Sequence, residues 1–456
     1  MHMIKRHELF NRRNAKLLVL LLLFSGICAG CLGQDPLEAR VDKLVRSLGN
    51  EDLNVGYASA YALIDIGEPS VDSLIKALKE DDPRVRSLAA FSLGRIGETR
   101  ASKALIEALE DSEPEVRMNS AEALGELEAP EAVDPLIELL DYDNDEVCSK
   151  VVFALGAIGN PKAAAPLIEL FGDRELGDSA ANSVGNLGDE DAVIILIGLL
   201  DSRNSNVRIN SIRALGQIQN PAAVPYLIKM LNDKVPEVRE EAASALGYFK
   251  EPEEIARAEQ PLIEALGDDE FEVQKAAAYS LGDIGSKEAI PFIATFLQTE
   301  DPALHRVAIH ALGSYKDPEA AAVLIDALDD ESWYMREAIV HLLSEIGDPQ
   351  AVDPLISLLG DEHHEIRQSA AWGLGRLGDK RAIEPLLKAL ETERDRDVRN
   401  AEVWALGELG GPEATEGLRR ISVDMEEYRN VRTAAEEALA KIDGGEEENS
   451  SSTSSK

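Results

Sequence analysis

Apolar residues recur along almost the whole chain with the spacing of one helical face. They fall at positions i, i+3, i+4 and i+7 in segments such as 85–97, and again in shorter segments such as 135–140. This period of 3.6 residues is typical of amphipathic helices. No stretch of useful length shows the strict alternation of a half-buried strand. The pattern therefore predicts an all-α protein.

The same pattern repeats, which predicts that the fold is built from similar units. Most units are anchored by a Leu-Gly pair, and neighbouring anchors are mostly 31 residues apart, as from Leu93 to Leu124. One interval is 35 residues, from Leu246 to Leu281, so four residues are inserted near 253–258. Periods of this length indicate repeat architectures. The thirteen anchors are Leu63, Leu93, Leu124, Leu155, Val184, Leu215, Leu246, Leu281, Leu312, Leu343, Leu374, Leu406 and Leu439.

Proline positions support the same division into two helices per unit. Nineteen of the 20 prolines occupy three places in the repeat: six residues after the anchor, at the start of the second helix, and at the start of the first helix. Pro130, Pro135 and Pro114 are examples of the three. Proline is tolerated in a first helical turn because its missing N–H has no partner there.

The motif Val-Arg-x-x-Ala-x-x-Ala-Leu-Gly-x-Ile-Gly, seen in 85–97, and the motif Pro-Leu-Ile-x-x-Leu-Leu resemble HEAT repeats, in the short subtype named after phycobilisome lyases. The resemblance covers residues 53–442. It implies an α-solenoid of about 12–13 two-helix repeats, each packed on its neighbours. Residues 37–52 would form an N-terminal capping half-repeat, and the acidic, Ser-rich segment 443–456 is expected to be disordered.

An arginine recurs seven residues before the anchor, and an acidic residue often lies six residues before that arginine. The resemblance implies that these residues form a ladder of ion pairs that joins neighbouring repeats. A row of phosphate-binding arginines is the alternative. The arginines are Arg86, Arg117, Arg208, Arg239, Arg336, Arg367, Arg399 and Arg432.

The first 30 residues predict a targeting segment outside the fold. Basic residues precede the apolar run 17–24, which is too short to span a bilayer and matches a signal-peptide core. The following Cys28-Ala29-Gly30-Cys31 resembles a lipobox, although Cys28 replaces the usual aliphatic residue. We expect cleavage after residue 30, lipid on Cys31, a linker over 31–36, and attachment to the extracytoplasmic face of the cell membrane. An uncleaved signal anchor is the alternative.

Charge and cysteine content narrow the classes of function. The formal net charge of −39 argues against nucleic-acid binding, which needs a basic face. Only 5% of the residues are aromatic, which favours helices packed by small and aliphatic side chains. Once residues 1–30 are removed and Cys31 is lipidated, Cys148 is the one remaining thiol, and we expect it to be a small buried residue.

Features of an enzyme are few. Deoxyhypusine hydroxylases are HEAT-like metalloenzymes with His-Glu pairs just after the arginine position, but no histidine occupies that position here. The one His-Glu pair, His364-Glu365, precedes the helix. Bilin lyase activity is implied only by the name of the repeat subtype. We therefore expect no catalytic residues, metal or cofactor; an enzyme or enzyme-accessory protein of either family remains the alternative.

One position of the repeat, two residues before the anchor, carries rings in five consecutive units. It lies between recurrent small residues, and in this subtype it points from the first helix into the concave groove of the solenoid. Rings combine large contact area with a low entropy cost, which suits a binding surface. The sequence thus predicts a monomeric scaffold that binds a protein or peptide partner. A stabilising groove floor and a glycan-binding surface are the alternatives. The five residues are Tyr279, His310, His341, Trp372 and Trp404.

Overall fold

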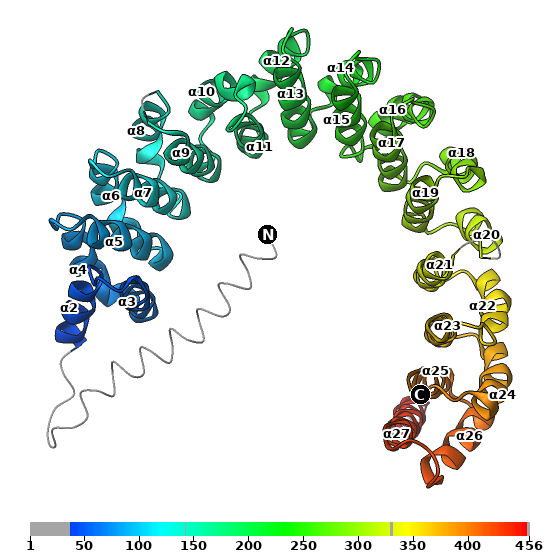
Figure 1. Ribbon diagram of the computed structural model, residues 1–456. Helices are drawn as coiled ribbons and strands as arrows, with labels where there is room; N and C mark the ends of the chain where they lie inside the picture. The colour runs from blue at the N-terminus through cyan, green and yellow to red at the C-terminus, as the bar shows by residue number, and fades with distance from the viewer. Residues whose placement is uncertain (1–36, 142, 329–331, 454–456) are drawn as a thin grey trace, which may run out of the picture. The chain divides into compact units, whose positions relative to one another are not determined.

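The computed structural model describes residues 37–141, 143–328 and 332–453, with side chains up to residue 443, and its regular structure in these ranges is entirely helical (Figure 1). The chain divides into two compact units, Met1–Ala245 and Leu246–Lys456. In each unit the short helices lie on one side and the long helices on the other (Figure 1). The predicted all-α solenoid of two-helix repeats is confirmed.

Through most of the first unit a long helix packs against the next long helix and against a short helix. The long helices are α3 (Leu53–Ile66), α5 (Pro83–Ile96), α7 (Pro114–Glu126), α9 (Asp145–Ile158), α11 (Gly177–Leu187), α13 (Ser205–Ile218) and α15 (Pro236–Leu246). The shorter helices are α2 (Leu37–Ser47), α4 (Val71–Ala77), α6 (Ser102–Ala108), α8 (Val133–Leu139), α10 (Ala164–Glu169), α12 (Glu190–Leu199) and α14 (Val224–Met230).

The second unit continues the same alternation. Its long helices are α17 (Phe271–Ile284), α19 (Pro302–Ser314), α21 (Trp333–Ile346), α23 (His364–Leu377), α25 (Arg396–Leu409) and α27 (Arg429–Thr453). The helices between them are α16 (Pro252–Ala265), α18 (Ile290–Ala294), α20 (Pro318–Asp326), α22 (Val352–Leu358), α24 (Ile383–Thr392) and α26 (Pro412–Val423).

Two segments differ from the sequence-based expectation. Residues 443–453, expected to be disordered, lie in α27. They include Glu446, Glu447 and Glu448, which have good helix propensity. The second segment is α16, which runs for 14 residues through Pro261, whereas several repeats, such as that of Pro130, place a short 3-10 turn before a helix of seven residues. The four inserted residues thus extend a helix.

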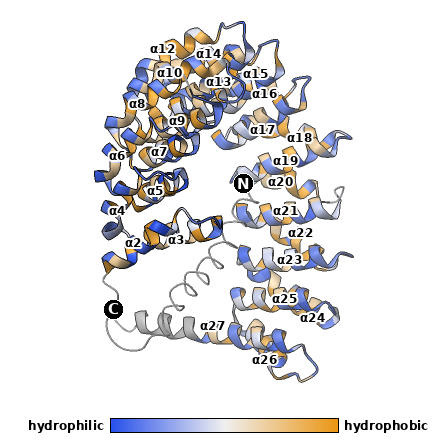
Figure 2. Ribbon diagram, turned by 60° about the vertical axis from the view of Figure 1, so that its left-hand side comes forward, coloured by the Kyte–Doolittle hydropathy of each residue, from blue (hydrophilic) through white to orange (hydrophobic). Residues whose placement is uncertain are grey.

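The repeats are held together by buried anchors and by close contacts between backbones. Leu93 and Leu124 are fully buried. Next to them, a Cβ on Gly94 would lie 2.7 Å from Ala123 Cα, so a larger residue there would push the neighbouring long helices apart. Figure 2 shows hydrophobic and hydrophilic residues interleaved along the helices, as expected for helices that bury one face.

Helix ends follow the sequence pattern. Pro83 and Pro114 open α5 and α7, as predicted from their positions. Gly97 ends α5 in the left-handed conformation, with φ of 82°, which glycine adopts without a steric cost. The 3-10 turns that lead into several short helices begin at prolines placed six residues after the anchor, such as Pro130.

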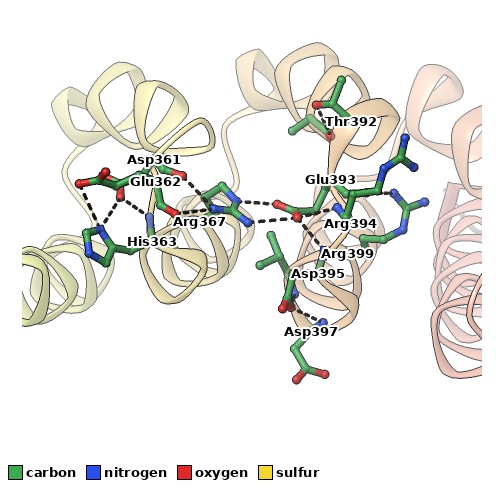
Figure 3. A network of polar contacts seen from close by, with 12 residues as sticks. Asp361, Glu362, His363, Arg367, Thr392, Glu393, Arg394, Asp395, Asp397 and Arg399 are labelled. Atoms are coloured by element: carbon green, nitrogen blue, oxygen red, sulfur yellow. Dashed lines mark hydrogen bonds and ion pairs between the residues drawn. The ribbon is translucent and has the colours of Figure 1, made fainter.

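The ladder of ion pairs between repeats is confirmed. Arg86 Nε donates to Asp111 Oδ2 at 2.6 Å, and Asp111 is the acidic residue six positions before the next arginine, Arg117. Figure 3 shows the same arrangement further along, where Arg367 Nε donates to Glu393 Oε2 at 2.6 Å. Arginines of the ladder also donate to backbone carbonyls of their own repeat, as Arg367 does to the Asp361 carbonyl at 2.8 Å. The ladder therefore ties a repeat to the one that follows where an arginine occupies this position and a carboxylate faces it. Such pairs are formed by Arg86, Arg117, Arg208, Arg336, Arg367 and Arg399.

The leader 1–30, the linker 31–36 and Cys31 lie outside the described residues. No helix within the described part of the chain has the length and apolar content needed to cross a bilayer. Helix α2, in the predicted capping half-repeat, packs against α3, α4 and α5. Cys148 is a free, buried thiol, as predicted, and burial raises its pKa.

Candidate partner-binding surface

The five ring-bearing residues lie on five consecutive long helices of the second unit. We call Tyr279, His310, His341, Trp372 and Trp404, on α17, α19, α21, α23 and α25, the ring row. Tyr279 is 38% exposed and Trp372 is 40% exposed, while Trp404 is half-buried. Both histidines are exposed. The expectation that these side chains point away from the helix contacts is thus confirmed for four residues and is met in part by Trp404.

The local reason for this exposure is the pattern of small residues around each ring. Ala371 and Gly373 flank Trp372 and are both buried, so the packed face of α23 lies on either side of the ring position. Tyr279 stands in the same way between Ala278 and Ser280, which are 0% and 4% exposed. The ring is therefore directed away from the buried contacts of its helix.

Trp404 is less exposed because it packs against the preceding repeat. Its ring centroid lies 4.0 Å from that of Trp372, with the ring planes inclined by 42°. Glycine at position 375 provides the space, because a Cβ there would lie 2.6 Å from Trp404 Cζ3. The two tryptophans form one aromatic surface that spans α23 and α25.

A hollow of about 400 Å³ lies beside Trp372, between α21 and α23. His341 and Trp372 of the ring row line it together with Tyr334, Glu337 and Arg376. Tyr334 precedes His341 by seven residues, which is two helical turns, so both lie on one face of α21. The hollow thus combines aromatic rings with one acidic and one basic side chain. Sequence analysis did not assign Tyr334, Glu337 or Arg376 to the site; the seven-residue spacing was the available indication for Tyr334.

A second hollow of about 410 Å³ brings together Tyr279 and His310. Asp283 and Ser314, each one turn further along the same helices, complete its lining. The structure thus groups the ring row into Tyr279 with His310, His341 with Trp372, and Trp372 with Trp404. Among the described residues, no group of three or more His, Cys, Asp or Glu side chains is arranged to hold a metal ion.

The charges beside the ring row are mixed. His341 Nδ1 lies 3.8 Å from Glu345 Oε1, and Glu408, one turn after Trp404, pairs with Lys441 at 2.5 Å. Arg376 occupies the equivalent place one turn after Trp372. The surface therefore offers apolar ring area bordered by charges of both signs, which is the composition of many protein-binding surfaces.

The first unit carries a related but less continuous surface. At the same position of the repeat, Tyr61 and Phe91 meet edge to face with centroids 6.0 Å apart. Phe153 is 54% exposed and lines a hollow of about 390 Å³ with Glu122 and Asn182. Sequence analysis did not single out Phe153, although it occupies the same repeat position as the ring row.

The architecture and the exposed ring row define a helical-repeat solenoid. Models of the HEAT-repeat family match residues 71–155, 195–260, 259–344, 322–405 and 365–440. A PBS lyase HEAT-like repeat matches residues 147–173. The chain belongs to the HEAT-repeat family, as the sequence motifs predicted. The comparison with curated proteins finds no match.

Solved structures with a similar fold include yeast importin-β and the karyopherin Kap121p. The chain is 15% identical to a chain of a Kap95:Nup1 complex, with a TM-score of 0.63 over 89% of this chain and 67% of that one. It is 12% identical to yeast importin-β (Kap95p), with a TM-score of 0.57 over 89% and 72%. It is 14% identical to Kap121p bound to the extreme C-terminus of the protein phosphatase Cdc14p, with a TM-score of 0.56 over 96% of this chain and 56% of that one. At these identities the likeness shows the fold alone.

Proposed function

We propose that this chain is a non-catalytic scaffold that binds a protein or peptide segment along the ring row. The observation that carries the proposal is the exposure of rings on consecutive long helices beside two hollows. Exposed ring surface is costly to hydrate, at roughly 25 cal/mol per Å², and a partner that covers it removes that cost. The solved solenoids named above include complexes with Nup1 and with a C-terminal segment of Cdc14p, which supports protein binding as the class of function.

We further propose that the scaffold is anchored to the extracytoplasmic face of the cell membrane through lipid on Cys31. The basic leader, the apolar run 17–24 and the small residues before Cys31 support this location. The anchor would hold the partner-binding surface close to the membrane. A monomer suffices for this arrangement because one chain carries both the anchor and the ring row.

Trp372→Ala tests the proposed surface. Interface tryptophans often contribute about 2 kcal/mol or more, so we expect capture of the partner from solubilised membranes to fall at least about tenfold. Tyr226→Ala is the matched control. It removes a ring of similar exposure, 40%, from the short helix α14 of the first unit, outside the ring row.

The two variants together distinguish the proposal from its alternatives. Equal capture by the wild type and the Trp372 variant, with both folded, would refute the proposed surface. Retention of an oligosaccharide instead of a protein by the ring row would favour the glycan-binding alternative. A chromophore adduct or stoichiometric metal on the purified chain would favour the enzyme alternative.

A further inference from the structure

Glu402 occupies a position that is small or aliphatic in every other repeat. It lies on α25, four residues before the anchor Leu406, and its side chain is completely buried. The residues at the same position of the other repeats are also buried. They are Ser59, Ala89, Ser120, Val151, Ala180, Ser211, Ala242, Ala277, Ala308, Ile339, Ala370 and Ala435. Glu402 is therefore the one ionisable side chain at this position.

The carboxyl group of Glu402 is buried without a partner. Neither Oε1 nor Oε2 accepts a hydrogen bond within the described residues. The two nearby guanidinium groups serve the ladder: Arg367 pairs with Glu393 at 2.6 Å, and Arg399 pairs with Glu427. An ionised carboxylate without a hydrogen-bond partner is far more costly to bury than a neutral carboxyl.

The charged groups around Glu402 do little to offset the cost of burying its carboxylate in the ionised form. Glu393, just before α25, repels its charge, while Arg399 on α25 and Arg367 on α23 attract it. The charged side chains of α24 and α26 are exposed. Before and on α27, Glu427 is held by Arg399, and Arg432 donates to the backbone oxygen of Glu427 at 2.9 Å.

We propose that Glu402 is a proton-operated switch in the C-terminal repeats: it holds a proton while α25 is packed between α23 and α27, and loss of that proton loosens the packing. The switch is independent of the proposed partner. It does, however, act on the helix that carries Trp404, whose ring packs against Trp372. Loosening of α25 therefore disturbs one end of the ring row.

The direction of the pH effect follows from linkage. Burial is the main cause that raises the pKa of Glu402 to about 8 in the folded chain, and the Glu393 charge adds to it. The pKa of a glutamate in the unfolded chain is about 4.3. Between these values the folded state binds the extra proton. The packing of α25 between α23 and α27 is therefore most stable at low pH. Its stability falls as the pH rises between the two pKa values and levels off above the higher one.

Amide hydrogen exchange tests the switch in the full-length chain. From about pH 5.5 to about pH 8, with intrinsic exchange rates corrected for pH, the opening constant of α25 should rise by up to about tenfold per pH unit. In Glu402→Ala, which introduces the residue most common at this position, the opening constant should not change with pH. Glu391→Ala, which removes an exposed charge of α24, should keep the wild-type dependence.

If the opening constant of α25 depends on pH in the same way in the wild type and in Glu402→Ala, the proposal is overturned. If the alanine variant fails to fold, Glu402→Gln supplies a second test by infrared difference spectroscopy at about pH 6.5, above the ordinary glutamate pKa. The wild type should show the C=O band of a protonated, buried carboxyl that the glutamine variant lacks. Absence of that band would also overturn the proposal.

Discussion

At the scale of single residues, the recurring arginine and the ring that follows it on the same helix have separate roles. Arg367, like Arg86 and Arg399, is largely covered and binds a carboxylate of the next repeat. Trp372, five residues later on the same helix, is exposed beside a hollow. One helix thus supplies cohesion between repeats through one position and exposed ring surface through another.

Arg367→Ala should destabilise the second unit. The substitution leaves the Glu393 carboxylate, which is only 6% exposed, without its ion pair, and it removes a donor from the Asp361 carbonyl. Loss of one partner of a covered pair leaves an uncompensated charge, so we expect a loss of about 2 kcal/mol in the free energy of unfolding. Thermal and urea unfolding followed by circular dichroism measure it.

The control for this prediction is Arg381→Ala. Arg381 pairs with Asp353 and Asp379 on the surface, where water screens the charges, so little change in stability is expected. Equal destabilisation by both variants would contradict the role given to the ladder.

The exposure of one tryptophan of the ring row could be predicted from the sequence, and that of the other could not. Exposure of Trp372 follows from the small residues that flank it, and those are visible in the sequence. The half-burial of Trp404 depends on the absence of a side chain at Gly375 in the preceding repeat, and the hollow depends on side chains from two helices. Such contacts between repeats are set by packing geometry that residue spacing does not specify.

At the scale of helices, the repeat pattern predicted most of the structure because each helix is marked at several independent positions. Anchors such as Leu93, opening prolines such as Pro83 and closing glycines such as Gly97 agree on the bounds of α5. Prediction was poorest where the pattern is interrupted. In α16 four extra residues lengthen a helix, and beyond Lys441 no anchor marks the end of α27.

Deletion of one whole repeat should be tolerated better than deletion of half a repeat. Removal of residues 125–155 joins Leu124 to Gly156 and restores a Leu-Gly pair, so the flanking helices can pack as neighbours. Removal of 125–140 takes away α8 and leaves α9 without the short helix that covers it. Circular dichroism should show a cooperative melt for the first variant and a large loss of helix for the second.

Complete loss of helicity on deletion of 125–155 would contradict packing between nearest neighbours as the source of stability. Similar melts for the two deletions would contradict the assignment of the repeat boundaries.

At the scale of the whole molecule, one chain combines a predicted lipid anchor with a row of exposed rings. The acidic surface, with a net charge of −39, disfavours binding to nucleic acid or to anionic lipid head groups. Lipid on Cys31 would therefore supply the attachment to the membrane, and the ring row would supply selectivity for the partner.

Cys31→Ser should release the chain from membranes. Without the thiol no lipid can be attached, and the chain should appear in the soluble extracytoplasmic fraction. Fractionation followed by mass spectrometry of the N-terminus measures both location and processing. Membrane retention with residues 1–30 still attached would instead show that the leader acts as an uncleaved anchor.

The most direct test of the central claim is site-specific photo-crosslinking in cells. A photoreactive phenylalanine analogue at His341, in the ring row, should give a cross-linked protein partner that Trp372→Ala reduces. The same analogue at Phe292, a ring that is 50% exposed on the short helix α18, should give none. Cross-links from position 292 but none from position 341 would contradict binding along the ring row.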